Sequence, residues 1–381
     1  MGKLTIRASR KEDIDLIMSM YDNSRREMRA GGNHSQWVGG YPSLATVEDD
    51  ILKGYGFIIE DNGIAIGTFA FIVGRDHTYE KIFYGQWDED DRPYGTIHRM
   101  ARASGARGVF KACVDWCRQM IPSLRIDTHA DNATMIHLIE KHGFKYKGII
   151  LIDDGTERKA YQMVDCGKLC IPLIKYLEDN IIPQYQYFDQ AHREDHVRSV
   201  INNSLDLASH YPVEINMVYA TAAYHDLGLV EGRELHHLVS GQIMRDDKML
   251  RTWFNEKQIT TMSEAVEDHR ASRREPPRSL YGRIVAEADR DIEPLKIIRR
   301  TIQYGINNHP GLDKEGQWSR TLEHLNEKYA EGGYLKLWLP ESKNTKPLNE
   351  LRALINDKEK LRVIFDEMFD DIVAKTMGEK R

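Results

Sequence analysis

The sequence pattern changes near residue 166, and this change limits the folds that the chain can adopt. Before it, short apolar stretches such as "KLTIRA", "GFIIED" and "GIAIGTFAFIV" alternate with segments of helical periodicity, which is typical of an α/β domain with a mixed sheet. After it, strand patterns almost vanish and amphipathic helical stretches follow one another. We therefore expect an α/β domain at 1–165, a linker at 166–182, an all-α domain at 183–310 and a helical extension at 311–381.

Two local signals mark elements inside the α/β region. The Asn62-Gly63 pair predicts a tight hairpin turn that leads into the strand "GIAIGTFAFIV". Thr46 is expected to cap the helix that runs through "TVEDDILKG", because its hydroxyl can accept a hydrogen bond from a backbone N–H of the first turn.

The composition excludes several classes of protein. The 53 basic and 59 acidic residues give a net charge of −6, which offers no overall attraction to nucleic acid or to an anionic membrane. No apolar run approaches the ~20 residues that span a bilayer, and the first twenty residues are too charged for a signal peptide. Four cysteines do not suggest a disulfide scaffold. We expect a cytoplasmic protein that acts on small molecules, with no membrane or stable nucleic-acid partner; a homo-oligomer is left open.

A histidine and an aspartate stand side by side in "AAYHDLGL", residues 222–229, at the end of an apolar run. Both side chains bind divalent metals, and both can also satisfy a helix end without a metal. A buried helix would deliver His225 and Asp226 to its end, where Gly228 can end the turn.

More histidines and one more aspartate occur in the neighbouring helical stretches: His192, His196, His236, His237, His269 and Asp289. A single histidine is more often a core or surface residue than a ligand. We keep that interpretation for His192 and His236, since each has a neighbour that is better placed to bind a metal.

The order H…HD…D, formed by His196, His225-Asp226 and Asp289, resembles the HD superfamily of metal-dependent phosphohydrolases. The resemblance covers about residues 185–300 and implies an all-α fold with metals held between helices. His237 and His269 resemble the additional ligands of its two-metal members. The implied ligands are His196, His225, Asp226, His237, His269 and Asp289. Residues 311–381 match no part of this motif set, so their role is open.

Mixed imidazole and carboxylate ligands suit manganese, iron, nickel or zinc. Two such ions ~3.5–4 Å apart can clamp a phosphate and stabilise the attacking and leaving oxygens, with Asp226 as the natural bridge. We expect Asp226, His269 and the adjacent cation Arg270 to take part in catalysis on a small phosphoester or a nucleotide. The arginines that follow either bind phosphate too or belong to a solvated loop; they are Arg273, Arg274, Arg278 and Arg283.

In the first half, "SGARGVFKACVDW" places a glycine-containing loop before a helix, where backbone N–H groups can bind a pyrophosphate. Together with the strand "LRIDTH" and the stretch "DNATMIHLIEKHGFKYKG", it resembles the GNAT N-acetyltransferase family over roughly residues 3–165. The resemblance implies an acetyl-CoA site at which a primary amine attacks the thioester directly. The implied cofactor-binding residues are Met100 beside a splayed strand, Gly105, Gly108 and Val109 in the pyrophosphate loop, and Asn132.

The sequence departs from the GNAT pattern at three positions. Gly105 stands where the family favours a basic residue or glutamine, Phe110 where it favours glycine or alanine, and Ile139 where it commonly has a tyrosine acid. A catalytically degenerate acetyl-CoA-binding module that regulates the hydrolase is therefore an alternative to an active acetyltransferase.

Aromatic and acidic segments lie where an acceptor amine would bind. Trp37, Tyr41 and Trp87 could form the wall of a pocket, and the acidic run at 88–91 could attract a cation. The interpretation we favour is plainer: the aromatic rings anchor the packing, and the acidic run is a solvated loop.

Overall fold

The computed structural model describes residues 4–188, 193–270 and 275–378 of the chain. It divides into two compact units, Met1–Tyr176 with Asp247–Ile259, and Leu177–Asp246 with Thr260–Arg381. The return of 247–259 to the first unit is not visible in the sequence pattern. Polar contacts fix this segment there: the Tyr176 hydroxyl donates to Asp247 at 2.5 Å, and the Asn255 amide donates to Asp91 at 3.1 Å.

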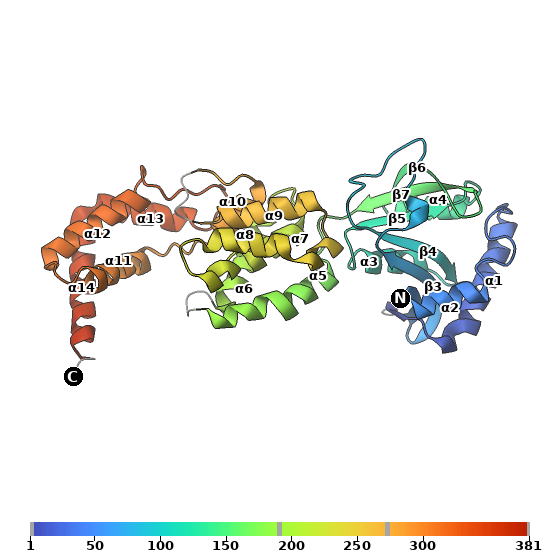
Figure 1. Ribbon diagram of the computed structural model, residues 1–381, viewed down its shortest axis with the longest axis horizontal. Helices are drawn as coiled ribbons and strands as arrows, with labels where there is room; N and C mark the ends of the chain where they lie inside the picture. Colours follow the sequence, from blue (N-terminus) through green and yellow to red (C-terminus); the bar gives the residue numbers. More distant parts are fainter. Residues whose placement is uncertain (1–3, 189–192, 271–274, 379–381) are drawn as a thin grey trace. The chain divides into compact units, whose positions relative to one another are not determined.

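The first unit is built on a seven-stranded mixed sheet with the order β1-β2-β3-β4-β5-β7-β6 (Figure 1). Only the β4–β5 pair is parallel among the described strands. The strands are β1 Leu4–Ala8, β2 Gly56–Asp61, β3 Ile64–Val73, β4 Gly95–Arg102, β5 Ser123–Thr128, β6 Lys145–Leu151 and β7 Glu157–Val164. The helices are α1 Ile14–Ala30, α2 Leu44–Leu52, α3 Val109–Cys117, α4 Ala133–Lys141 and α5 Ile171–Tyr176.

Helices cover both faces of this sheet. Alternate residues of a strand point to opposite faces, so neighbouring residues on one strand pack against different helices. Ile58 and Ile59 follow one another on β2 and are both fully buried. Ile58 packs in a cluster with Met20 of α1 and Val47 of α2, whereas Ile59 belongs to the cluster of Val114 in α3. The sheet is therefore the middle layer of a three-layer α/β structure.

The two local signals have different outcomes. Asn62 and Gly63 have φ values of 52° and 79°, so the predicted hairpin turn between β2 and β3 is confirmed. The predicted cap at Thr46 is wrong: α2 begins two residues earlier, and the Ser43 hydroxyl accepts the hydrogen bond from the Thr46 N–H at 3.2 Å. Thr46 lies inside the first turn of α2, so the residue that precedes the helix, Ser43, caps it.

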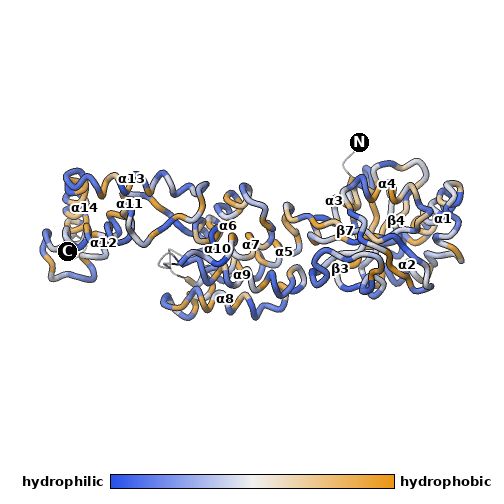
Figure 2. The backbone as a smooth tube through the Cα atoms, turned by 90° about the horizontal axis from the view of Figure 1, so that it is seen from above, coloured by the Kyte–Doolittle hydropathy of each residue, from blue (hydrophilic) through white to orange (hydrophobic). Residues whose placement is uncertain are grey.

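The second unit is helical throughout its regular structure (Figure 1). Its helices are α6 Glu194–Ala208, α7 Ile215–Tyr224, α8 His236–Asp246, α9 Glu256–Asp268, α10 Leu280–Ala288, α11 Pro294–Asn308, α12 Lys314–Tyr329, α13 Thr345–Asn356 and α14 Lys358–Gly378. The first residues of α9, up to Ile259, belong to the first unit, and the helix belongs to the second unit from Thr260 onward. Apolar and hydrophilic residues alternate along most of them (Figure 2), but α7 is buried along Asn216–Tyr224 and forms the centre of the unit.

The segment 311–378 shares one hydrophobic core with α11, through residues such as Ile298, Leu325 and Phe365. No described helix combines the length and the apolar character that crossing a bilayer requires.

The sequence predicted that Gly228 can end the turn after α7, whereas Gly228 lies inside the short 3-10 helix Leu227–Glu231. Its importance is a close approach between two segments. A Cβ added to Gly228 would lie 2.1 Å from the His236 carbonyl oxygen and 2.6 Å from the Ser240 nitrogen, so only glycine lets the turn after Asp226 pack against α8. The Gly228 N–H also donates to the Ser240 hydroxyl at 2.8 Å.

We expect Gly228→Ala to lower the free energy of unfolding by about 1–3 kcal/mol, because backbone atoms must move to accept the new methyl group. Urea unfolding followed by circular dichroism measures this change. Gly311→Ala is the control, since nothing lies within 4 Å of its added Cβ. An unchanged unfolding free energy in Gly228→Ala would contradict the close packing.

Candidate functional site

Six side chains from the ends of different helices converge in the second unit. α7 delivers His225 and Asp226 just past its last turn, α6 contributes His196 near its start, and α8 begins at His236. His269 follows the end of α9, and Asp289 follows α10. Helix ends bring these side chains together because each chain segment changes direction there.

The first group of donor atoms surrounds one oxygen of Asp226. Its Oδ2 lies 3.3 Å from His225 Nε2 and 3.6 Å from His196 Nε2, and these two nitrogens are 3.3 Å apart. Asp289 Oδ1 completes the group at 3.2 Å from His196 Nε2 and 3.8 Å from His225 Nε2. Two imidazoles and two carboxylates thus face one point.

The second group surrounds the other oxygen of the same carboxylate. Asp226 Oδ1 lies 3.4 Å from both His236 Nε2 and His269 Nε2, which are themselves 3.4 Å apart. Among the described residues, the two sets of three side chains able to hold an ion are His196, His225 and Asp226, and Asp226, His236 and His269. Asp226 is common to both sets.

Backbone carbonyls orient the imidazoles. The Nδ1 atoms of His225, His236 and His269 lie 2.8, 2.9 and 2.6 Å from the carbonyl oxygens of Ala222, Arg233 and Val266. A carbonyl only accepts, so each Nδ1 carries the proton and each Nε2 keeps a lone pair that points into the cluster. This tautomer is the one a metal requires.

The electrostatics of the cluster favour a cation. Burial raises the pKa of the Asp226 carboxyl, but the surrounding histidines outweigh burial and hold that pKa well below its usual value. Burial lowers the pKa of His196, yet hydrogen bonds to Asp226 and Asp289 outweigh it and raise the pKa to about 10. The negative charge of the two carboxylates thus favours a cation at this place, and the mixed imidazole and carboxylate donor set fits a transition metal.

Solvent reaches the cluster from one side. His225 and His269 are 0% and 2% exposed at their side chains, whereas His196, Asp289 and His236 are 24%, 23% and 14% exposed. A substrate would enter on the side of the three more exposed residues.

The structure brings His236 into the cluster in place of His237. Both are near the start of α8, where one residue further along turns a side chain by about 100°. His237 belongs to neither group of donor atoms, and burial lowers its pKa to about 4. The resemblance implied His237 as the ligand and set its neighbour His236 aside, and this choice differs from the geometry, which brings His236 to Asp226 and His269.

The basic run after His269 separates into different roles. Arg270 donates to the Glu234 carbonyl at 2.7 Å, and its charge contributes to the lowered pKa of His236, after burial as the main cause. Arg278 pairs with Glu267 and Asp268 at 2.6 and 2.9 Å, so it stabilises α9 and does not face the cluster. His192, Arg273 and Arg274 lie outside the described residues.

One supporting residue is invisible to sequence reasoning. Tyr185 is fully buried, and its hydroxyl donates to the Ala223 carbonyl at 3.0 Å and accepts from the Asp226 N–H at 3.2 Å. It holds the turn that carries His225 and Asp226. No spacing or motif marks it, because its partners are backbone atoms.

In the first unit the sheet splits between β4 and β5. The two strands pair from Gly95–Ile97 to Leu124–Ile126, while β4 remains paired with β3 as far as Arg102. A bulge explains the split: two β4 residues, Arg99 and Met100, stand opposite one β3 residue, and Arg99 has φ 51°. A cavity of about 1670 Å³ opens at this place.

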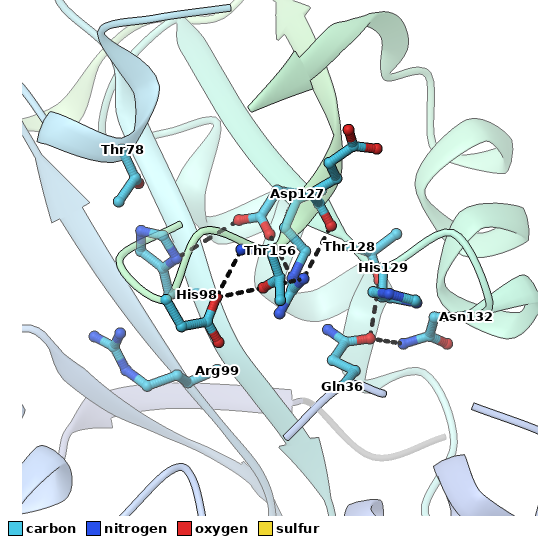
Figure 3. Close-up of polar contacts among 12 residues, drawn as sticks. Gln36, Thr78, His98, Arg99, Asp127, Thr128, His129, Asn132 and Thr156 are labelled. Atoms are coloured by element: carbon cyan, nitrogen blue, oxygen red, sulfur yellow. Dashed lines mark hydrogen bonds and ion pairs between the residues drawn. The ribbon is translucent and has the colours of Figure 1, made fainter. Parts of the chain in front are cut away.

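The expected cofactor-binding residues line this cavity or its loop. Met100, Gly108, Val109 and Asn132 contact it, and Gly105 lies in the adjoining loop with φ 76° and open space beside its Cα. Gly108 precedes α3 with φ 78°, so the loop presents its N–H groups at a helix N-terminus. Asn132 caps α4 through Met135 N at 3.1 Å and donates to Gln36 at 2.9 Å (Figure 3).

The structure shows where two of the residues that depart from the family pattern lie, Phe110 and Ile139. Phe110 is buried in the sheet core, with its ring centroid 5.1 Å from that of His142, so its bulk turns away from the loop backbone. Ile139 is fully buried in the same core, where a hydrophobic residue is expected and no acid can be supplied.

A polar cluster lies at the mouth of the split, one residue beyond the last β4–β5 pair (Figure 3). His98 of β4 faces Asp127 of β5, with Nδ1 4.0 Å from Oδ1, and its Nε2 is 2.8 Å from Asp76 Oδ2. The Tyr79 hydroxyl donates to Asp127 at 2.6 Å. Burial raises the pKa of Asp76, but His98 and Thr78 outweigh it and hold that pKa far below its usual value. Sequence reasoning missed this cluster because its members come from separate elements.

The aromatic residues named for the acceptor side are mostly packing residues. Trp87 is 5% exposed and stacks on the Arg125 guanidinium at 4.1 Å, and Trp37 packs edge-on against Tyr21 at 5.3 Å. Tyr41 is exposed at the edge of the cavity. In the acidic run, Asp88 pairs with Lys147 at 2.6 Å and Asp90 with Arg125 at 3.2 Å.

The chain thus combines a mixed sheet that splits between β4 and β5 with a helical unit that holds a cluster of histidines and aspartates. The HD domain family model matches residues 193–292. A solved GNAT-family acetyltransferase from Streptococcus agalactiae is 32% identical, over 42% of this chain and 95% of that chain, with a TM-score of 0.39. A GNAT-family acetyltransferase from Listeria monocytogenes is 17% identical, over 43% and 95%, with a TM-score of 0.35. No curated protein matches.

The N-terminal part of the chain belongs to the GNAT acetyltransferase family, and residues 193–292 carry an HD domain. The expected order, a GNAT-like α/β domain with a mixed sheet followed by an all-α HD-type domain, is confirmed. At the level of families, the chain is an acetyltransferase fold fused to an HD hydrolase-type domain.

The two adjacent histidines of α8 give a direct test of the ligand set. We expect His236→Ala to lower the metal content by about one ion per chain, because it removes one of the three donors in the group of Asp226, His236 and His269. His237→Ala should keep the full metal content. Inductively coupled plasma mass spectrometry of proteins purified without chelators measures both. Loss of metal in His237→Ala, with none in His236→Ala, would contradict the geometry.

Proposed function

We propose that the HD domain is a metal-dependent phosphohydrolase with two ions, which acts on a small phosphoester or a nucleotide. The observation that supports it most is the position of Asp226, whose two oxygens face two separate groups of donors. A carboxylate that ligates one ion needs only one group of donor atoms beside it. The second group of donors around Asp226 is the reason to propose a second ion.

Six side chains of the cluster would coordinate the two ions. His196, His225 and Asp289 would hold one ion, His236 and His269 the other, and Asp226 both. Two ions of this kind supply an activated water and neutralise the charge of the phosphate. Manganese, iron, nickel and zinc all accept such mixed nitrogen and oxygen donors, and we propose an ion of this group.

Substrate charge would be met by the side chains at the open side of the cluster. Arg270 is half-buried, and its backbone anchor at Glu234 keeps a permanent cation near His236. Guanidinium groups bind phosphate oxygens with two parallel hydrogen bonds, so Arg270 would orient the phosphate that the ions hold. His269 and Asp226 would act through the ions as ligands.

We further propose that the first unit transfers an acetyl group from acetyl-CoA to an amine in the split between β4 and β5. The amine nitrogen would form a bond to the thioester carbonyl carbon, lose a proton and release the CoA thiolate. His98 is the residue best placed to take that proton, because Asp76 fixes its Nε2 and its Nδ1 faces the cavity beside Asp127.

The second candidate for this unit is an acetyl-CoA-binding module without turnover. The observation in its favour is the buried Ile139, which leaves no tyrosine acid at that position of α4. Isothermal calorimetry with acetyl-CoA, followed by an assay of acetyl transfer to a broad set of amines, separates the two. Binding without transfer to any amine would support the module.

The hydrolase prediction uses the bridging residue. We expect the Mn²⁺-loaded protein to hydrolyse one or more phosphoesters in a panel of nucleotides and sugar phosphates, measured as phosphate release. Asp226→Asn should lower kcat by roughly 1000-fold or more, since a neutral amide cannot bridge two cations. Activity equal to that of the unchanged protein in Asp226→Asn would contradict the proposal.

The acetyltransferase prediction uses His98. We expect His98→Ala to lower kcat for acetyl transfer by roughly 100-fold or more at neutral pH, with little change in acetyl-CoA affinity. His137, exposed on α4, is the control, and its change to alanine should leave both quantities unchanged. Equal effects of the two variants would exclude His98 as the proton acceptor.

A further inference from the structure

The segment 338–344, which we call the clasp, lies outside the matched HD region and yet contacts the turn that carries Asp289. The turn comprises residues 287–292, which are the last two residues of α10 and the four residues that follow it, before α11. The sequence assigned no role to this part of the chain.

The Asn344 side chain makes the central contacts of the clasp. It is 2% exposed, and its Nδ2 donates to the carbonyl oxygens of Glu287 and Arg290 at 3.2 and 3.0 Å. Its Oδ1 accepts from the Ile292 N–H at 3.1 Å. One amide thus holds three backbone groups: one carbonyl before Asp289, one carbonyl after it, and one N–H at the end of the turn.

Two further connections hold the same turn. The Trp338 N–H donates to Glu287 Oε1 at 2.6 Å, and the same oxygen accepts from Arg290 at 2.6 Å, in a pair that is almost fully buried. On the other side, the Lys343 ammonium donates to Asn203 at 2.8 Å, and Asn203 donates to the Ala288 carbonyl at 3.1 Å.

These contacts reach the carbonyls of residues 287 and 288, in the last turn of α10, where a helix runs out of N–H partners, and the carbonyl of residue 290 in the turn beyond it. Water could satisfy them as well, but water would not fix the backbone between them. The Asp289 carboxylate lies 3.2 Å from His196 Nε2, and a shift of the turn would move it out of the donor group.

We infer that Asn344 is a positioning residue for the metal centre, and that the clasp fixes Asp289 as a ligand. The inference rests on the proposed metal centre. It gives the C-terminal region a role in the site: the HD motif supplies the carboxylate, and residues beyond the motif set its place.

The test is a Co²⁺ titration of the metal-free full-length protein, followed by the visible absorption of the bound ion. We expect Asn344→Ala to weaken binding of one of the two ions by roughly 10- to 100-fold and to change its absorption bands, as loss of an outer hydrogen-bond partner does at metal sites. Asn203→Ala, at a half-buried position, should shift the same ion in the same direction with a smaller effect.

Gln317→Ala is the matched control. Gln317 is also 2% exposed, and its amide also donates to two backbone carbonyls, those of Gly305 and His309 at 3.1 and 2.8 Å, at the end of α11. We expect a comparable loss of thermal stability in Gln317→Ala, with Co²⁺ affinity and spectrum unchanged.

Three results would overturn the inference. Asn344→Ala could bind both ions like the unchanged protein, or Gln317→Ala could weaken binding equally, which would make the effect one of general stability. If Asn344→Ala does not fold, an unchanged Co²⁺ affinity and spectrum in Asn203→Ala would have the same meaning. An unchanged protein that binds no Co²⁺ would remove the metal centre itself, a failure distinct from the first three cases.

Discussion

A single buried carboxylate, Asp226, lies among four imidazoles, and the helical unit is arranged around it. Its side chain is 6% exposed, so the charge must be compensated by groups that the protein itself holds in place. Each of three imidazoles is fixed by a backbone carbonyl at its outer nitrogen, and Tyr185 fixes the backbone of Asp226. Gly228 then lets the next segment approach α8 closely enough for His236 to join. Moving any of these groups would leave a buried charge without its partners.

Both candidate sites lie where regular structure ends or is interrupted. In the helical unit, every donor to the cluster comes from the first or last turn of a helix or lies within two residues beyond its end. In the sheet, a bulge at Arg99 and Met100 separates β4 from β5 and opens the cavity. Regular hydrogen bonding saturates backbone groups, so side chains and N–H groups become available for ligands where it stops.

The sequence predicted those features that depend on neighbours along the chain. An apolar run before His225-Asp226 indicated a buried helix, and α7 is that helix. Alternation and turn residues indicated the mixed sheet. Features that depend on distant contacts were not predictable: His236 and His237 differ only in the direction of their side chains on α8, and Gly228 is required by an approach of α8 that no local pattern records. The clasp at Asn344 and the polar cluster at His98 join segments far apart in the sequence, through backbone carbonyls and a split strand pair.

The central claim is that one carboxylate is shared between two metal ions, and electron paramagnetic resonance of the Mn²⁺-loaded protein tests it most directly. Two ions that share Asp226 would be ~3.5–4 Å apart, close enough for exchange coupling between their spins. The account predicts a coupled spectrum at two equivalents of Mn²⁺, and the spectrum of an isolated ion once Asp226 is replaced by asparagine. A spectrum of isolated Mn²⁺ ions at two equivalents in the unchanged protein would contradict the shared carboxylate.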